Sequence, residues 1–455
     1  LARLSAVLVL TVASFTYVTA QINATGTIAS VALDIPFEIA VYVGLASILL
    51  CSMLGGMRAV TWTQVAQYIV LIIAYLLPVF WISNKMGAGF FPHLMLGDEV
   101  ARIAELEGQF GFVKNSAADL ATVPKGLAGI TKAHSSVNGT NWGFISLAIC
   151  MMAGTASLPH VMMRYFTTPS VKSARRSVAW SLLFIFLLYS TAPMLATLSK
   201  LSLIDPTLST GIIGKSITEV QALDWYQNWN QAKLMFVSDF NGNGTLELNE
   251  FFMGGKAVVL ATPEIAGLPY VISGLVAAGG MAAAMSTADG LVLAIANALS
   301  HDLYYKIIDP KAETAKRLIV ARVLLVLIGF AGATIAAMKI QGILGSVIWA
   351  FDFAMSGLFF PLVLGVWWKR ANAQGAVAGM LLGLAAGTWY LVHVRTGGAG
   401  FWGVTQLTFG IVGSLVSLVS MVIVSLLTKA PDAKTQAMVD EVRIPSGKTV
   451  LGKQH

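Results

Sequence analysis

Residues 149–160 have the sequence ICMMAGTASLPH and lie inside an apolar run that extends from about residue 141 to residue 163. Gly154 and Pro159 together are expected to interrupt the i to i−4 hydrogen bonds of a helix here. Backbone groups freed at membrane depth are stable only where they line a cavity or where neighbours bond to them. Such a broken helix is typical of a transporter's binding site. The alternative is a plain proline kink, with Ser and Thr hydroxyls bonded to nearby carbonyls.

The composition of the whole chain is that of a membrane protein. Of the 455 residues, 56% are hydrophobic and only 11% are charged, and the mean hydropathy is +0.75. A soluble domain carries about a quarter charged residues. Apolar runs of about twenty residues predict an all-α polytopic protein. About ten spans are expected, near residues 4–30, 37–54, 61–83, 141–163, 177–199, 267–300, 316–338, 343–366, 373–393 and 404–427.

Basic residues in short loops predict the orientation of these spans, because such loops stay in the cytoplasm. The loops concerned contain Arg58; Arg164, Lys172, Arg175 and Arg176; Lys306, Lys311, Lys316 and Arg317; Lys369 and Arg370. The net charge of +7 is spread over them, so we expect a lipid bilayer and no nucleic acid as partner. The sequence says nothing about the oligomeric state. We expect a multi-pass protein of the cell membrane, most simply a bacterial inner membrane.

The expected organisation follows from the spans and their orientation. It comprises three spans in 1–83, an outward loop at 84–140, two spans in 141–199, an outward loop at 200–266, five spans in 267–428, and a cytoplasmic tail at 429–455 that we expect to be disordered. Residues 1–20 imitate a signal peptide. The apolar character resumes beyond Ala20 and the chain starts with Leu1, so we expect instead a true span in a sequence whose beginning is missing.

A second apolar run contains adjacent hydroxyl residues, Ser286 and Thr287, one turn after Ala283. With the Ala283 carbonyl they offer hard, uncharged oxygen ligands, which suit a monovalent cation such as sodium. The alternative is that both hydroxyls simply bond the preceding turn of their own helix. Asp289 follows in the same run, where it either faces a cavity or partner or marks a helix end at the interface.

Four motifs in order resemble the sodium:solute symporter family, and within it most resemble the cation/acetate symporters. They are GGMRAVTWTQ at 55–64, GTASLPHVMMRYFT at 154–167, AAAMSTAD at 282–289 followed by HDLY at 301–304, and the stretch 361–379 that contains WWKR. The resemblance covers nearly the whole chain except the outward insertions and the tail. It implies an inverted-repeat, LeuT-like transporter fold with thirteen or more spans, of which the ten here match the last ten.

The resemblance also implies roles for particular residues. It implies a sodium site formed partly by the Ala283 carbonyl and by the hydroxyls of Ser286 and Thr287, with the remaining ligands on a first core helix that we expect to precede residue 1. One departure concerns Gln64, where many members of the family carry Asp. A sodium exit relay through that carboxylate is therefore not expected here.

The outward loop at 239–250 matches the calcium-binding loop of an EF-hand. Oxygen side chains, the turn glycine and the final carboxylate fall at the required positions 1, 3, 5, 6, 7, 9 and 12, which are Asp239, Asn241, Asn243, Gly244, Thr245, Glu247 and Glu250. Trp225, Trp229 and Phe236 are expected on an entering helix, and Phe251 and Phe252 on an exiting one. With only three acids and no second hand, the loop is expected to bind calcium weakly; the alternative is an ordinary Asn/Gly turn.

These patterns predict a secondary active transporter that couples sodium entry to uptake of a small organic anion, most simply a short monocarboxylate such as acetate. The broken helix is expected to bind the anion at Gly154, Thr155 and Ser157, near which a half-helix would begin. The alternatives are a solute-sensing membrane module, a symporter for another solute such as an amino acid, and a channel. No phosphate-binding loop or catalytic constellation is apparent, so we expect neither an ATP-driven pump nor an enzyme.

For other polar residues within the apolar runs, the sequence gives weaker predictions. For Gln21 and Gln64, hydrogen bonding between helices is favoured over lining the path, whereas burial makes Asp352 the better functional candidate. His160 and Arg164 are expected to anchor the cytoplasmic end of their span.

Overall fold

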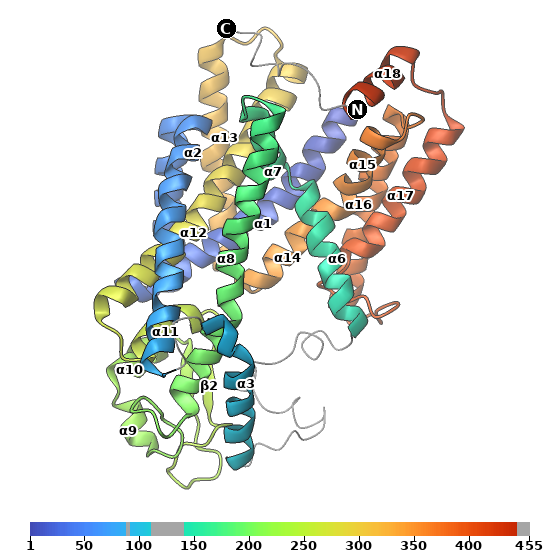
Figure 1. The fold of residues 1–455 in the computed structure, drawn as a ribbon. Helices are drawn as coiled ribbons and strands as arrows, with labels where there is room; N and C mark the ends of the chain where they lie inside the picture. The colour runs from blue at the N-terminus through green and yellow to red at the C-terminus, as the bar shows by residue number, and fades with distance from the viewer. Residues whose placement is uncertain (88–91, 111–140, 444–455) are drawn as a thin grey trace.

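The computed structural model describes residues 1–87, 92–110 and 141–443, and it shows a long helical bundle with a small subdomain at one end (Figure 1). Within these residues, eight helices are long and apolar enough to span a membrane. The pair Asn141–Ser157 and Pro159–Tyr165, bent by 48°, makes a ninth span, and Phe37–Met53 is a shorter apolar helix. The expected all-α membrane architecture is therefore confirmed.

The elements of the bundle are α1 (Ala2–Leu33), α2 (Phe37–Lys85), α6 (Asn141–Ser157), α7 (Pro159–Met162), η2 (Met163–Thr167), α8 (Val171–Ile204), α12 (Tyr270–Asn297), η3 (Ala298–Ile308), α13 (Thr314–Ala337), α14 (Ile343–Ala354), η4 (Met355–Phe359), α15 (Phe360–Trp367), α16 (Ala373–Arg395) and α17 (Gly410–Leu427). Of these, η2 is a 3₁₀ helix, whereas η3 and η4 are π-helical continuations of α12 and α14.

Element α2 is two helices joined at Gly56. This glycine has φ 56° and ψ −164°, a backbone conformation that side chains with a Cβ rarely adopt. The chain therefore reverses there, and the segments Phe37–Met53 and Ala59–Lys85 lie on either side of the turn.

The centre of the bundle is formed by α1, α2 and α12, with α14 packed against α1. Small residues let these helices approach closely. A Cβ added to Gly279 of α12 would lie only 2.4 Å from the Ala74 Cβ of α2. This packing holds the Ser286 segment of α12 against the second half of α2.

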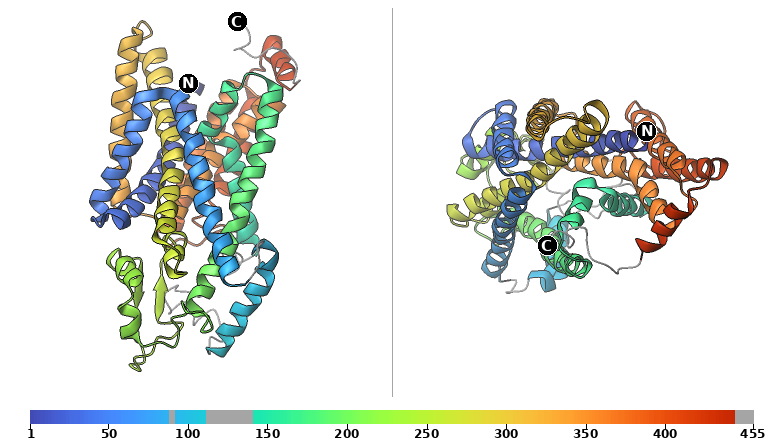
Figure 2. Two further views of the ribbon diagram at one scale, coloured as in Figure 1. Left: turned by 60° about the vertical axis from the view of Figure 1, so that its left-hand side comes forward. Right: turned by 90° about the horizontal axis from the view of Figure 1, so that it is seen from above.

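The subdomain consists of α3 (Pro92–Gln109), α9 (Ile217–Gln221), α10 (Asp224–Gln231), β1 (Met235–Val237), β2 (Phe251–Met253) and α11 (Val258–Ile265). It lies at the end of the bundle away from the N-terminus (Figures 1 and 2). It has its own hydrophobic core, which includes Ile103, Trp229, Leu246 and Phe251. The predicted outward loops thus contain folded structure.

Two ion pairs attach α3 to the C-terminal end of α8. Arg102 pairs with Asp205, which directly follows α8, and Lys200 of α8 pairs with Glu107. Lys200 and Asp205 are both almost completely buried, so each charge is compensated where it leaves water. These pairs fix the position of α3 relative to the bundle.

The expectation of a disordered tail is wrong for part of it. Residues Ala433–Glu441 form α18, whose first turn is capped by the Asp432 carboxylate accepting from the Thr435 amide at 3.1 Å. Lys369, at the end of α15, forms a 2.7 Å ion pair with Asp440. A cap and a tertiary ion pair order a segment that lacks an apolar period. The last part of the tail, residues 444–455, lies outside the described residues.

Candidate functional site

A polar cavity of about 480 Å³ lies between α2, the second half of the broken helix, α8 and α12. Its lining residues are Gln64, Gln67, Tyr68 and Leu71 of α2, His160 of α7, Arg164 of η2, Ile185 of α8, and Ser286, Thr287 and Gly290 of α12. Amide, imidazole, guanidinium and hydroxyl groups therefore meet within the membrane-spanning bundle, where polar side chains commonly mark a functional path.

Three oxygens converge on the α12 side of this cavity. The Ser286 Oγ donates to the Ala283 carbonyl at 3.0 Å, and the Thr287 Oγ1 approaches the same carbonyl at 3.4 Å. This is the expected bonding within the helix, and it also brings together the three oxygens proposed to bind sodium. Both hydroxyl residues line the cavity.

Gln64 connects α2 to this segment. Its Nε2 donates to the Ser286 carbonyl, so the amide bonds to the helix that carries the hydroxyls. The interaction is the helix-to-helix hydrogen bond expected from the sequence, and it also orients the Gln64 side chain in the cavity.

The broken helix has its break later than expected. Helix α6 continues to Ser157, Leu158 is extended with φ −70° and ψ 120°, and the second half begins at Pro159. The N–H groups near Gly154 and Thr155 are therefore still within α6, and the expectation that a half-helix begins there is wrong. Proline has no N–H to donate and fits the first turn of a helix, which explains why the second half starts at Pro159.

The three residues expected to bind the anion have different environments, and none is among the residues that line the described cavity. The exposed Thr155 donates to the Met151 carbonyl at 2.6 Å, and the buried Ser157 donates to the Ala153 carbonyl at 2.7 Å. A Cβ added to Gly154 would lie 2.6 Å from the Phe351 Cβ, so this glycine provides close packing against α14.

The sequence interpretation of His160 and Arg164 as anchors of a span end did not place them in this cavity. Both line the cavity that contains Ser286 and Thr287. The His160 ring also packs against the Tyr17 ring of α1, with centroids 5.8 Å apart. Their spacing of one helical turn, directly after the break, was a signal that both side chains share one face.

The two buried acids of the bundle lie outside the lining of this cavity. Asp289 is fully buried and accepts a 3.0 Å hydrogen bond from the Ser52 hydroxyl of α2. It therefore has a hydrogen-bond partner on a neighbouring helix. Asp352 is also fully buried, on α14 close to Gly410 of α17.

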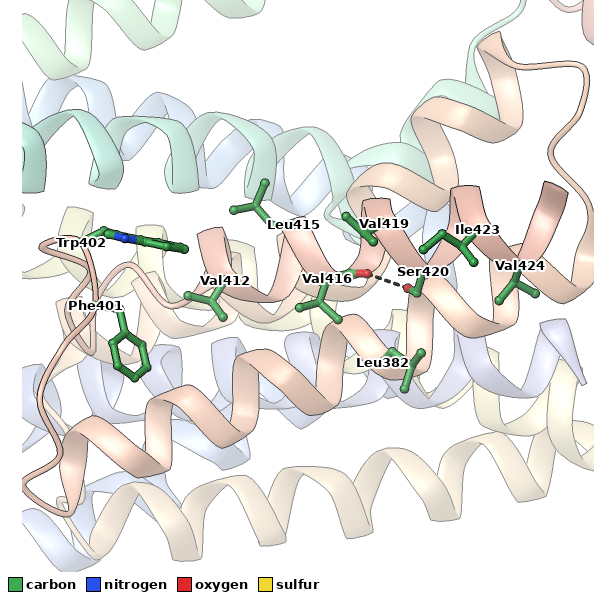
Figure 3. Close-up of a pocket in the computed structure, with 10 residues that line it drawn as sticks. All are labelled: Leu382, Phe401, Trp402, Val412, Leu415, Val416, Val419, Ser420, Ile423 and Val424. Atoms are coloured by element: carbon green, nitrogen blue, oxygen red, sulfur yellow. Dashed lines mark hydrogen bonds between the residues drawn. The ribbon is translucent and has the colours of Figure 1, made fainter. Parts of the chain in front are cut away.

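A larger groove of about 660 Å³ lies along α16 and α17 (Figure 3). Ser420 is the single polar residue among its ten described lining residues, and its Oγ donates to the Val416 carbonyl at 2.6 Å. Such a surface suits lipid and provides no ligands for an ion or a carboxylate.

The loop at residues 239–250 is called the calcium-type loop here. Its carboxylates accept hydrogen bonds from backbone N–H groups. Asp239 accepts from Gly242 at 2.8 Å and from Gly244 at 3.1 Å, and Glu250 accepts from Phe240 at 2.9 Å and from Glu247 at 3.0 Å. The first and last ligand positions therefore both point into the loop.

The asparagines of this loop contact the same acid. The Nδ2 atoms of Asn241 and Asn243 donate to Glu247 Oε1 at 2.8 and 3.1 Å. Within the described residues, however, no group of three or more His, Cys, Asp or Glu side chains is close enough to hold a metal ion. The loop thus offers amide and backbone oxygens together with its acids, not a cluster of acids alone.

The expectation of EF-hand helices on both sides of the loop is wrong. Phe236 lies on β1 and Phe252 on β2, the two strands pair antiparallel with these residues opposite each other, and their rings stack at 4.5 Å. Only Trp225 and Trp229 lie on a helix, α10. Stacked aromatic pairs stabilise a two-stranded ribbon, so tertiary packing outweighs the helical interpretation of this aromatic spacing.

The chain is similar to known membrane transporters. The family model of the sodium:solute symporter family matches residues 1–209 and 256–383. An uncharacterized symporter of Cupriavidus necator is 35% identical over 514 residues, covering 94% of this chain and 74% of that protein. A monocarboxylic acid transporter of Corynebacterium glutamicum is 26% identical over 378 residues, covering 81% of this chain and 59% of that protein.

The fold is also similar to a solved structure. The substrate-bound outward-open state of a Na⁺-coupled sialic acid symporter matches with a TM-score of 0.60 at 17% identity, covering 95% of this chain and 75% of that one. This likeness confirms the expected transporter fold. The family comparison and the helices long enough to span a membrane identify a multi-pass membrane transport protein and not an enzyme. Since the family model covers most of the chain, the chain belongs to the sodium:solute symporter family.

Proposed function

We propose that this symporter couples sodium entry to uptake of a small organic anion, with short monocarboxylates such as acetate as the substrate class. The observation that carries the proposal is the convergence of the Ala283 carbonyl with the Ser286 and Thr287 hydroxyls beside a polar cavity. Uncharged hard oxygens suit a monovalent cation. The similarity to a monocarboxylic acid transporter supports the substrate class.

Of the three residues expected to bind the anion, Gly154, Thr155 and Ser157, we propose that Thr155 is the one whose side chain contacts it. Gly154 packs closely against Phe351 and Ser157 is fully buried, whereas the Thr155 hydroxyl is exposed. Sodium binding would stabilise the state that accepts the anion from outside, and rocking of one part of the bundle would then expose both ligands to the cytoplasm.

The test is uptake of radiolabelled acetate into proteoliposomes under an inward sodium gradient. Accumulation above equilibrium, abolished when potassium replaces sodium outside, is the expected result. Flux that only equilibrates would indicate a channel, and an absence of uptake for acetate and for competing amino acids would favour a sensor.

We also propose that residues 239–250 bind calcium on the outer side of the membrane. The donors would be side-chain oxygens of Asp239, Asn241, Asn243, Glu247 and Glu250 with the Thr245 carbonyl, which is the ligand chemistry that calcium prefers. The inward-pointing carboxylates of Asp239 and Glu250 support the proposal. With three acids, the expected dissociation constant is about 0.1 to 1 mM, as in extracellular calcium modules.

A further inference from the structure

The polar cavity carries a net positive charge. Arg164 is the one permanently charged side chain among the described residues that line it, and none of these residues is an acid. The acid on the adjacent stretch of α12, Asp289, is fully buried and bonded to Ser52. A guanidinium in a recess within a membrane bundle favours an anionic partner.

Two nitrogen donors meet above a glycine in this recess. A Cβ added to Gly290 would lie 3.4 Å from the Arg164 Nη2 and 3.6 Å from the Gln64 Nε2. These groups come from η2 and α2, and the missing side chain of α12 leaves space beside both. His160 lies one turn before Arg164, and its Nδ1 is buried without a hydrogen-bond partner in the described structure.

From this geometry we infer that Arg164, assisted by Gln64 and His160, binds the carboxylate of the transported anion. A guanidinium can donate two parallel hydrogen bonds to a carboxylate, and the Gln64 carboxamide adds a donor without a competing negative charge. The inference rests on the proposed function and assigns the carboxylate contact to Arg164 instead of Thr155, which is not among the residues that line the cavity.

The position of the recess explains how cation and anion would be bound together. Ser286 and Thr287 line the same cavity as Arg164, so a sodium ion and a carboxylate would lie near each other. A volume of about 480 Å³ holds a short organic acid with its remaining water. The favourable contact between the two charges would make binding of one ligand strengthen binding of the other.

The charge test compares two replacements of one residue in the sodium-driven uptake assay. Gln64→Asp places a carboxylate beside the guanidinium and is expected to raise the half-saturation concentration for acetate by about 10- to 100-fold, the range for a lost charged hydrogen bond. Gln64→Asn, which has the size of Asp without its charge, is the comparison: it shortens the side chain that carries the donor and is expected to raise the half-saturation concentration clearly less than Gln64→Asp does.

The direct test is Arg164→Gln, which is expected to raise the half-saturation concentration for acetate by a similar factor of about 10 to 100. Arg164→Lys is expected to give an intermediate value, because Lys retains the positive charge but not the two parallel N–H donors of the guanidinium. Arg175→Gln, at an exposed position on α8, is the matched control and should behave as wild type. If Arg164→Gln fails to accumulate in the membrane, Gly290→Ala replaces it: the added methyl group enters the space beside both nitrogens while retaining every charge.

A second readout separates this inference from the proposed function. Acetate is titrated onto purified, detergent-solubilised protein, and its protection against thermal unfolding is measured for wild type and variants. One outcome overturns the inference alone: the wild-type protein takes up acetate, and the acetate affinity is unchanged in Gln64→Asp and in Arg164→Gln (or its replacement Gly290→Ala). Binding that these changes weaken, without any wild-type uptake, overturns the proposed function alone. Neither uptake nor binding of acetate overturns both.

Discussion

Single residues of α12 carry the proposed sodium site. Ser286 and Thr287 lie three and four positions after Ala283, so one turn of helix is enough to bring both hydroxyls to its carbonyl. The hydroxyls can then either remain bonded within the helix or turn toward an ion.

We therefore expect Ser286→Ala and Thr287→Ala each to raise the sodium concentration for half-maximal uptake by about 10-fold, since each removes one ligand worth roughly 1–2 kcal/mol. Ser190→Ala is the matched control. Its hydroxyl bonds the Leu187 carbonyl within α8 in the same way, but Ser190 is not among the residues that line the cavity. A wild-type sodium response in both test variants would refute the assignment.

Sequence spacing was sufficient to predict that the three proposed sodium ligands lie close together, and insufficient for the rest of the cavity. Ala283, Ser286 and Thr287 lie within one helical turn, so local geometry brings them together. Arg164 and Gln64 meet only because α2, η2 and α12 pack around Gly290, and no local pattern specifies that packing. The polar surroundings of a cavity depend on contacts between distant segments, which a single sequence does not report.

At the scale of elements, the sequence predicted most spans but not their irregularities. Hydropathy located the long apolar helices because the bilayer requires that length. It did not show that the break in 141–163 falls at Leu158, where the backbone becomes extended before Pro159. It also did not show the strands beside residues 239–250, since aromatic residues fit a paired ribbon as well as a helix.

The packing of α6 against α14 gives a stability prediction. Gly154→Ala should lower the free energy of unfolding by about 1–3 kcal/mol, because the new methyl group would clash with the Phe351 backbone and must displace it. Gly274→Ala, on α12, is the matched control, since an added Cβ there meets no described atom within 4 Å. Thermal unfolding in detergent measures both. Equal stability of the two variants would show that α6 can move away from α14 at little cost.

At the scale of the whole molecule, the chain has a helical bundle and, at one end of it, a subdomain with its own hydrophobic core. The family model spans the bundle up to residue 209 and resumes at residue 256, so the calcium-type loop lies in the part that it does not match. The loop is nevertheless attached to its surroundings. Leu246 is fully buried in the core of the subdomain, and its amide donates to the Lys215 carbonyl at 2.8 Å. Ordering of the loop should therefore stabilise the neighbouring segment around α9.

This attachment makes calcium binding measurable without transport. Millimolar calcium should protect the 239–250 segment from limited proteolysis, whereas magnesium at the same concentration should protect it less because it demands a more rigid geometry. Glu250→Gln should abolish the protection, since it removes the carboxylate that would bind calcium through both oxygens while retaining the size of the side chain. Asp224→Asn removes an exposed acid of α10 outside the loop and should preserve the protection by calcium.

Sodium-driven uptake should fall only modestly in Glu250→Gln, because the loop lies in the subdomain and not in the cavity beside Ser286. Equal cleavage in calcium and in chelator would show that residues 239–250 form an ordinary turn.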